Sequence, residues 1–449
     1  MHFFRLLTLT CTGALLAACG GGSNDTSATY PNGYIQFYNG SADSATTSLK
    51  LTKDSKDYAI GSASYADATP LSSSLEPATY DYELYYTNST GDTVSKQKST
   101  VALNAGEKNL LIMTGGFTTP DVMKVTFNRD DTLDDNFKIT MVNLVANSNS
   151  YDLYLAASGK AFADAKLVGT AASKAQTQFQ TYPVGSYTLY VTKGGDKTPL
   201  YQSDLTSFNL ETEYVVVLRP ATGPAQNKFA LDMVLNTTTV TPLEDITAPA
   251  QVRVYNSINA INPGKVVLGD STTPLIDNLV PDTLSAYQDV KAGDYRVSLA
   301  DSKGNLVMRN GLASLAQGVV KTVVFYSDKT NTPAAITVND SKTPQVFDFT
   351  FNAVNTITDF DQISVYFVKP GYTIDTTAYY INTLNYASQS SMTLPAGEYT
   401  VFIVYKDANN NKSLLAQTQL TTLVKSSNYL LVAEKDATTA SGYKVSLVK

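Results

Sequence analysis

The chain has 449 residues, a formal net charge of −7 at pH 7, a single histidine and two cysteines. Cleavage of a signal sequence before Cys19 would remove His2 and Cys11, which excludes a Ser-His-Asp triad, a histidine-ligated zinc site and a disulfide bond. Acidic residues outnumber basic ones, 40 to 33, and phosphate binding needs clustered lysine and arginine. We therefore expect no catalytic residues, no metal, no cofactor and no nucleic-acid partner.

The first residues have the pattern of an export signal. MHFFR supplies one arginine, and LLTLTCTGALLAA is an apolar run too short to span a bilayer as a helix. LAAC, residues 16–19, follows as a small-residue cleavage site and resembles the lipobox of bacterial lipoproteins. The resemblance implies removal of residues 1–18 and lipidation of Cys19. Gly20 in place of aspartate implies outer-membrane sorting, facing either the periplasm or the medium.

A short tether separates this signal from the folded body. Residues 19–32 are small and polar, which suits a flexible connection between a lipidated cysteine and a domain. The membrane lipid that holds Cys19 is therefore one expected partner.

Four markers then recur in constant order. An opening strand ends in asparagine in YIQFYN, KITMVN, VRVYN and FDFTFN, at Asn39, Asn143, Asn256 and Asn352. A turn leading into a tyrosine-led strand follows in EPATYDYELYY, YPVGSYTLYV, VKAGDYRVSLA and LPAGEYTVFIVY, with tyrosines at Tyr80, Tyr187, Tyr295 and Tyr399. An unbroken apolar run comes next in EKNLLIM, ETEYVVVL, VKTVVFY and SNYLLVA, and a last strand closes each unit.

The spacing of the markers gives the domain organisation. The four tyrosines lie 107, 108 and 104 residues apart, which is the size of a compact domain. The sequence therefore predicts four tandem copies of one domain, at residues 33–130, 131–243, 244–342 and 343–449.

Each unit has the pattern of β structure. In the fourth, Tyr399, Val401 and Ile403 lie on one face of a strand and the intervening residues on the other. Polar turns such as KGGDK and DANNN predict a hairpin after this strand, and the apolar runs suit a central strand covered on at least one side. About seven short strands per unit predict an all-β fold of four immunoglobulin-like antiparallel β-sandwiches, each with its own core.

We interpret the repeated turn as a structural corner. In LPAG, Pro395 fixes φ at the second turn position and Gly397 takes the fourth. Tyr399 can then bury its ring and hydrogen-bond its hydroxyl across the sandwich edge, as in a tyrosine corner. The same role is expected of Tyr80, Tyr187 and Tyr295.

The order of these markers resembles the domain-of-unknown-function family 4397 (DUF4397) of bacterial cell-envelope proteins. The resemblance rests on the aliphatic-x-aliphatic-x-Asn opening, the Pro-Ala-Gly-x-Tyr-x-Val corner and the apolar strand after it, from about Gly33 to the C-terminus. It implies a β-sandwich protein of the envelope and provides no catalytic residues to transfer.

Acidic segments are candidates for calcium binding or catalysis. NRDDTLDDN lacks the alternating spacing and glycine of a calcium loop and suits a solvated linker. Asp407, Asn409 and Asn411 have calcium-loop spacing, but lysine replaces the glycine, which favours a hairpin tip. Asp359 and Asp361 share a strand face without a predicted cleft.

Two functions remain open. The first is a non-catalytic scaffold or adhesion protein that binds an unknown protein or matrix. The second is a polysaccharide- or small-ligand-binding protein, because 29 tyrosines and 17 phenylalanines could stack on sugars. The strand preference of tyrosine and the absence of tryptophan count against the second.

Overall fold

The computed structural model describes residues 31–449 except 89, 223–227, 238–239 and 426–427. This part of the chain forms 36 strands, one short 3-10 helix, η1 (Phe162–Asp164), and no α-helix. The predicted all-β fold of tandem β-sandwiches is confirmed. The predicted signal peptide (1–18), Cys19 and the tether to residue 30 lie outside the described residues. No helix of the described part is long and apolar enough to cross a membrane.

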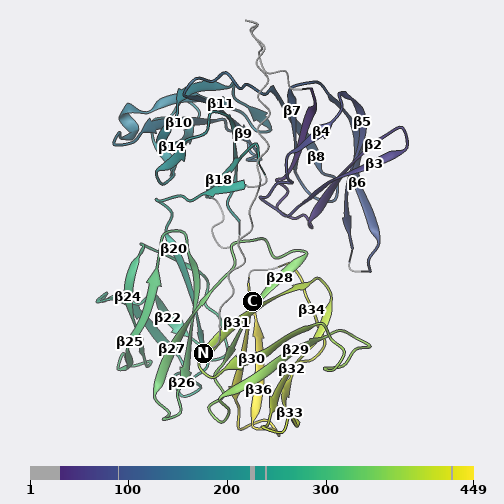
Figure 1. Cartoon of the computed structure of the whole chain (residues 1–449). Helices are drawn as coiled ribbons and strands as arrows, with labels where there is room; N and C mark the ends of the chain where they lie inside the picture. The colour runs from purple at the N-terminus through teal and green to yellow at the C-terminus, as the bar shows by residue number, and fades with distance from the viewer. Residues whose placement is uncertain (1–30, 89, 223–227, 238–239, 426–427) are drawn as a thin grey trace, which may run out of the picture.

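The first unit is a sandwich of two four-stranded sheets (Figure 1). Its strands are β1 (Gly33–Asn39), β2 (Thr47–Lys53), β3 (Lys56–Ala63), β4 (Ser72–Leu75), β5 (Ala78–Thr87), β6 (Thr93–Leu103), β7 (Glu107–Thr114) and β8 (Asp121–Asn128). One sheet has the order β4-β1-β7-β8 and the other β3-β2-β5-β6.

The second unit repeats this plan with extra edge strands. Its strands are β9 (Asn136–Asn143), β10 (Tyr151–Ala157), β11 (Lys166–Ala171), β12 (Ala175–Gln176), β13 (Gln180–Pro183), β14 (Gly185–Lys193), β15 (Pro199–Gln202), β16 (Thr206–Phe208), β17 (Glu213–Pro220), β18 (Phe229–Val234) and β19 (Val240–Leu243). One sheet runs β12-β9-β17-β18-β19, with β13 also on β9. The other runs β11-β10-β14-β15, with β16 on β14.

The third unit has eight strands in two sheets. They are β20 (Ala250–Asn256), β21 (Gly264–Leu268), β22 (Ile276–Leu279), β23 (Gln288–Val290), β24 (Gly293–Ala300), β25 (Leu306–Leu315), β26 (Val320–Ser327) and β27 (Pro333–Asn339). The sheet orders are β23-β20-β26-β27 and β22-β21-β24-β25.

The fourth unit follows the same order. Its strands are β28 (Asp348–Asn355), β29 (Gln362–Val368), β30 (Tyr379–Asn385), β31 (Ser388–Pro395), β32 (Glu398–Lys406), β33 (Lys412–Gln417), β34 (Thr421–Thr422), β35 (Tyr429–Lys435) and β36 (Tyr443–Val448). One sheet runs β31-β28-β35-β36 and the other β30-β29-β32-β33, with β34 on β32.

One pair of strands in each unit is parallel. The opening strand lies beside the unbroken apolar strand in the pairs β1–β7, β9–β17, β20–β26 and β28–β35. The sequence predicts antiparallel sandwiches, and this pair is the parallel one in each unit. A parallel pair needs a long crossover, and the strands of the opposite sheet provide it.

Each unit has a hydrophobic core of its own between its two sheets. The side chains on one face of the central strands belong to this core. Two positions before the end of the opening strand, the side chain lies in the core of its own unit; these residues are Phe37, Met141, Val254 and Ala353. Because side chains alternate across a strand, the next residue faces the other way.

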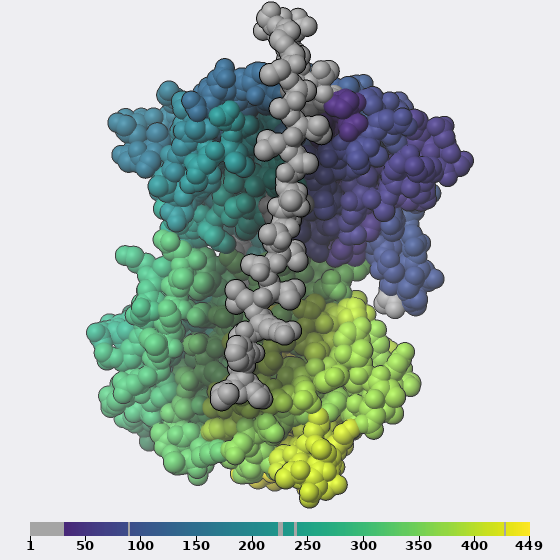
Figure 2. Space-filling view, in the orientation of Figure 1, coloured from purple at the N-terminus to yellow at the C-terminus, as the bar shows by residue number. Residues whose placement is uncertain are grey.

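The outer faces of the same strands pack the units in pairs. Tyr38, Leu110 and Ile112 of the first unit form one buried cluster with Val142, Val215 and Val217 of the second. Tyr255 and Val324 of the third unit form another with Val354, Leu430 and Val432 of the fourth. The apolar runs are therefore buried on both faces, and Figures 1 and 2 show one pair above the other.

The two pairs are joined through the link between the third and fourth units. Phe347, just before β28, packs against the core of the first unit, with its ring centroid 5.4 Å from that of Phe117. On the other side, the hydroxyl of Thr222 donates to the carbonyl oxygen of Lys342 at 2.9 Å. Residues of the last link thus contact both members of the first pair.

The asparagine that ends each opening strand holds the turn after it. The buried Asn39, Asn143 and Asn256 each accept a hydrogen bond from the backbone N–H two residues later, at 3.2, 2.9 and 2.9 Å. Each side-chain amide also donates to a backbone carbonyl of a neighbouring segment. A buried carboxamide satisfied in this way replaces backbone pairing where the strand ends.

In the fourth unit this residue is Asn355, so the expectation of Asn352 is wrong. Asn355 accepts from the N–H of Ile357 at 3.0 Å and donates to the carbonyl of Leu384 at 3.2 Å. The strand β28 contains both asparagines, and the sequence pattern matched the earlier one. Asn352 instead donates to Asp340 at 3.1 Å.

Candidate functional site

The four predicted corner tyrosines make the same hydrogen bond. Each hydroxyl donates to the backbone carbonyl of the residue four positions earlier, and the acceptors are Glu76 at 3.0 Å, Pro183 at 2.8 Å, Lys291 at 2.7 Å and Pro395 at 3.0 Å. The rings of Tyr80, Tyr187 and Tyr399 are buried in the cores of their units, and Tyr295 is half-buried. The structure leaves the four tyrosines in separate cores and does not gather them into one site.

The corner lies where the chain crosses from one sheet to the other. In the fourth unit, β31 ends at Pro395 in one sheet, and β32 begins at Glu398 in the other. The bond from the hydroxyl of Tyr399 to the carbonyl of Pro395 spans this crossing. Burial raises the pKa of Tyr399, so the phenol stays protonated and remains a donor.

The candidate calcium spacing at Asp407 lies at a hairpin tip. Its carboxylate accepts from the backbone N–H groups of Asn409 and Asn411 and from the Asn411 side chain, each at 2.8 Å. These hydrogen bonds lower the pKa of Asp407. Asp301 and Asn305 make the corresponding contacts in the third unit. The carboxylate therefore closes the turn between two strands.

Three of the other acidic candidates are paired with lysines. Asp130, in the run between the first two units, contacts Lys138 at 2.6 Å, and this bond lowers the pKa of Asp130 to about 2. Asp359 contacts Lys435 at 2.9 Å and Asp361 contacts Lys329 at 2.7 Å, on different neighbours. Among the described residues, no group of three or more His, Cys, Asp or Glu could hold a metal ion.

Buried polar side chains tie the first pair of units together. The hydroxyl of Tyr38 donates to the Asp232 carboxylate at 2.5 Å, across the interface. Arg219 binds the same carboxylate in two places, one of them at 3.1 Å, and contacts the hydroxyl of Tyr65 at 3.3 Å. Burial, followed by the charge of Asp232, raises the pKa of Tyr38. A charge-assisted cluster of this kind fixes how two apolar faces meet.

The second pair has its own buried cluster around Glu434. The carboxylate, 2% exposed, accepts from Tyr255 at 3.0 Å, from Ser446 at 2.5 Å and from the hydroxyl of Ser257. Burial raises the pKa of Glu434, against the effect of the serine hydroxyls. In both pairs, the tyrosine next to the terminal asparagine of the opening strand thus binds a carboxylate of the partner unit.

Arg253 lies buried elsewhere in the second interface. Its Nε donates to Thr322 at 2.9 Å and lies 3.5 Å from Asp340, while a terminal nitrogen donates to the carbonyl of Asn428 at 3.0 Å. Asn428 belongs to the fourth unit, so the guanidinium bridges the pair.

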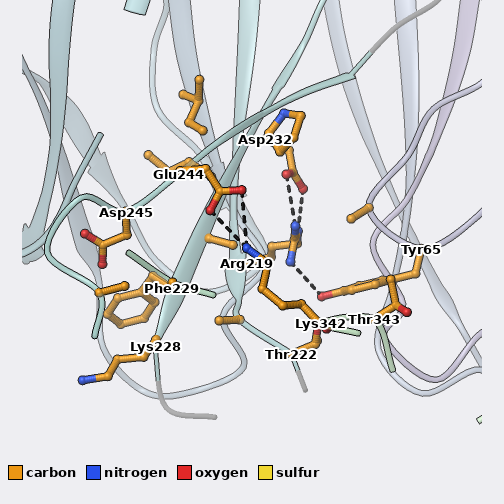
Figure 3. Close-up of a pocket in the computed structure, with 18 of the residues that line it drawn as sticks. Tyr65, Arg219, Thr222, Lys228, Phe229, Asp232, Glu244, Asp245, Lys342 and Thr343 are labelled. Atoms are coloured by element: carbon orange, nitrogen blue, oxygen red, sulfur yellow. Dashed lines mark hydrogen bonds and ion pairs between the residues drawn. The ribbon is translucent and has the colours of Figure 1, made fainter. Parts of the chain in front are cut away.

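A cavity of about 300 Å³ lies where the first three units meet the last link (Figure 3). Its lining includes Tyr65, Ala221, Phe229, Pro242, Pro249 and Thr343. The ion pairs Arg219–Asp232 and Lys342–Glu244, the latter at 3.2 Å, border it (Figure 3). These two cations hold neighbouring segments to one another, which makes the cavity a junction between units.

These interface residues are not among those that the sequence motifs indicate. Arg219 and Arg253 lie in apolar strands, where burial of a charged side chain is costly unless a partner accepts its charge. An arginine at such a position therefore indicates an interface. It does not identify the partner, because Asp232 lies on β18 and Asn428 lies just before β35, both far from their arginines in the sequence or on another strand.

No family model and no curated protein sequence matches the chain. Among solved structures, it is similar to a protein assigned to cell adhesion from Bacteroides fragilis NCTC 9343, with 12% identity and a TM-score of 0.14, over 47% of this chain and 91% of that one. It is also similar to BcpA, the major pilin subunit of Bacillus cereus, with 9% identity and a TM-score of 0.13, over 64% of this chain and 93% of that one. TM-scores this low add no argument to the geometry above.

Proposed function

We propose that this chain is a non-catalytic protein of the cell envelope, a scaffold of four β-sandwiches that binds a protein or matrix partner. The observation that carries the proposal is the position of the buried charges. Arg219, Arg253 and Glu434 are held by partners between paired units. We infer that these charged groups hold the paired units together and do not act on a substrate. Membership of the DUF4397 family is part of the same proposal, on the motifs given above.

The proposed function is tested by loss and competition. Cells that lack the chain are compared with complemented cells for attachment to a matrix-coated surface, and purified residues 31–449 are added as competitor. We expect attachment to fall in the deletion and to be blocked by the competitor. Unchanged attachment, together with turnover of an envelope polysaccharide by the purified chain, would contradict a non-catalytic scaffold.

The proposal includes a lipid anchor at Cys19 in the outer membrane. Several acyl chains on one cysteine hold far better than a single chain, since each buried CH₂ contributes about 0.8 kcal/mol. Cys19→Ser should release the protein from membranes or stall its processing, as measured by fractionation and immunoblotting. A variant that is cleaved yet still sediments with membranes would contradict the anchor.

Polysaccharide binding is the second candidate, and an aromatic surface on the fourth unit favours it. The rings of Tyr366 and Tyr380 are stacked, with centroids 5.8 Å apart and planes inclined by 28°. Tyr380 is 46% exposed and Tyr372 is 59% exposed. Tyr366 is buried, so Tyr380 is the ring of the stacked pair that reaches the surface. An exposed tyrosine ring offers an apolar face with a polar edge, which suits a sugar ring.

A glycan array separates this candidate from the scaffold. Binding to one class of polysaccharide that is lost in Tyr380→Ala and Tyr372→Ala would support it. The matched control is Leu200→Ala, an exposed apolar residue of the second unit, which should leave binding unchanged. An array without any bound glycan would count against the candidate.

A further inference from the structure

Lys108 is a fully buried lysine in the interface between the first and second units. It lies on β7, with its side chain 0% exposed. Its Nζ lies 2.7 Å from Oε1 of Gln36 and 2.7 Å from Oδ1 of Asn236. Gln36 belongs to the adjacent strand of the same sheet, whereas Asn236 follows β18 of the second unit. The amine is thus enclosed by two neutral carboxamides.

A buried carboxylate holds the far side of Asn236. Glu213, 1% exposed, accepts a hydrogen bond from Nδ2 of Asn236 at 2.8 Å. The same carboxylate contacts Arg129 at 3.1 Å and the N–H of Asp130 at 2.6 Å. The carboxamide of Asn236, itself half-buried, is therefore fixed between a buried amine and a buried carboxylate.

The charge state of the amine follows from this enclosure. Desolvation, followed by repulsion from Arg129, lowers the pKa of Lys108 to about 7, and Glu213 opposes the shift. A large part of the amine is then neutral near pH 7 and has a free electron pair. A desolvated neutral lysine is a nucleophile.

We propose that Lys108 and Asn236 form an intramolecular amide bond that joins the first unit covalently to the second. Nζ attacks Cγ of Asn236, the Cγ–Nδ2 bond breaks and one molecule of ammonia leaves. Glu213 accepts a proton from the attacking nitrogen and returns it to the departing Nδ2. Atoms and electrons balance without an oxidant or cofactor. The fixed positions of the groups supply the proximity that this slow reaction needs.

Gln36 lies equally close to the amine, but its side-chain carbonyl carbon is not the one attacked. Its Nε2 donates to the backbone carbonyls of Thr69 at 3.0 Å and Thr237 at 3.2 Å, and a backbone carbonyl cannot deliver a proton to a leaving nitrogen. Only Asn236 has a carboxylate on its leaving nitrogen. Gln36 acts as a positioning residue that orients the amine.

Mass spectrometry of the purified full-length chain tests the bond. After denaturation, the folded wild-type chain should be lighter by one ammonia molecule, and trypsin should release a branched peptide that joins Lys108 to Asn236. Lys108→Arg and Asn236→Ala should have full mass and no branched peptide. Glu213→Gln should form the bond slowly or not at all. Lys124→Arg, at an exposed lysine on β8, is the control that keeps the loss of ammonia.

The wild-type chain alone can overturn the proposal. If it has full mass and Lys108 reacts with an amine-modifying reagent after denaturation, the cluster is only a hydrogen-bonded lysine. Loss of ammonia that maps to Gln36 or to another residue would overturn it as well. Circular dichroism of each variant must show native β structure, so that a missing bond reports on chemistry and not on misfolding.

Discussion

At the scale of the residue, the corner tyrosine stabilises its unit through both its ring and its hydroxyl. The ring of Tyr399 is 1% exposed in the core of the fourth unit, and its hydroxyl donates to Pro395. The ring contributes by burial of apolar area, whereas the hydroxyl contributes one hydrogen bond. The two terms differ in size, so substitutions can separate them.

We expect Tyr399→Ala to lower the free energy of unfolding by about 3–5 kcal/mol, because it leaves a cavity in the core. Tyr399→Phe should cost only about 1 kcal/mol, for the hydrogen bond. Urea denaturation of the full chain measures both. The control is Tyr372→Ala, at a tyrosine that is 59% exposed, with an expected change within about 0.5 kcal/mol. Equal losses at the two sites would contradict a structural corner.

The Glu434 carboxyl makes the second pair of units sensitive to pH. Burial raises its folded-state pKa above the ordinary value of 4.5, so the folded chain binds this proton more tightly than the unfolded chain. The stability that results is fully present below about pH 4.5 and is lost as the pH rises through the raised pKa.

Glu434→Gln should remove this dependence. The difference in urea midpoint between variant and wild type is therefore expected to increase in favour of the variant as the pH rises from about 4.5. Glu398→Gln, at an exposed glutamate, should show no such trend. A difference in urea midpoint that stays constant with pH would mean that burial does not raise the pKa of the Glu434 carboxyl.

At the scale of the element, the central strands have two buried faces with different partners. Leu111 and Met113 of β7 face the core of the first unit, while Leu110 and Ile112 face the second unit. Each fully buried aliphatic side chain contributes about 1.5–3 kcal/mol relative to exposure. The outer face thus adds stability of the same kind as a core.

Ile112→Ala tests the outer face. Although Ile112 lies outside its own sandwich, we expect a loss of about 2–5 kcal/mol, as for a core position. The matched control is Leu414→Ala, at a strand residue that is 54% exposed, where the loss should stay within about 0.5 kcal/mol. Thermal melting of the full chain is the measurement. A small loss at both sites would show that the units do not pack as described.

The alternation of apolar and polar residues predicts some parts of this structure and not others. The period-two pattern and the polar turns predict the strands and hairpins, and Asp407 lies at a hairpin tip. The unbroken run LLIM indicates that both faces are apolar, but pattern alone does not say what covers the second face. Two asparagines in β28 misled the assignment of Asn352, because only the turn geometry distinguishes Asn355. No sequence pattern indicates the role of Lys108, because Gln36 lies on another strand and Asn236 follows β18 of the second unit.

At the scale of the whole molecule, the four sandwiches form two pairs. Each pair shares a buried apolar cluster in addition to the cores of its members. A unit removed from its partner exposes that cluster to water, and an exposed apolar patch of this kind promotes association. The pair is therefore the unit that we expect to be stable in isolation.

A fragment of residues 31–243 should be monomeric and unfold cooperatively, because it keeps the first interface complete. A fragment of residues 31–130 should self-associate or unfold at a lower temperature, because Tyr38, Leu110 and Ile112 lose their partners. Analytical ultracentrifugation and melting curves measure both properties. A single unit that is monomeric and as stable as the pair would contradict the shared interface.

Pairing also constrains how such a chain can change in length. Adding or deleting one repeat would leave an opening strand and an apolar strand with an outer face that no neighbour covers. Adding or deleting two adjacent repeats that already pack together leaves every such face covered. We therefore expect chains built this way to contain an even number of repeats and to gain or lose repeats two at a time.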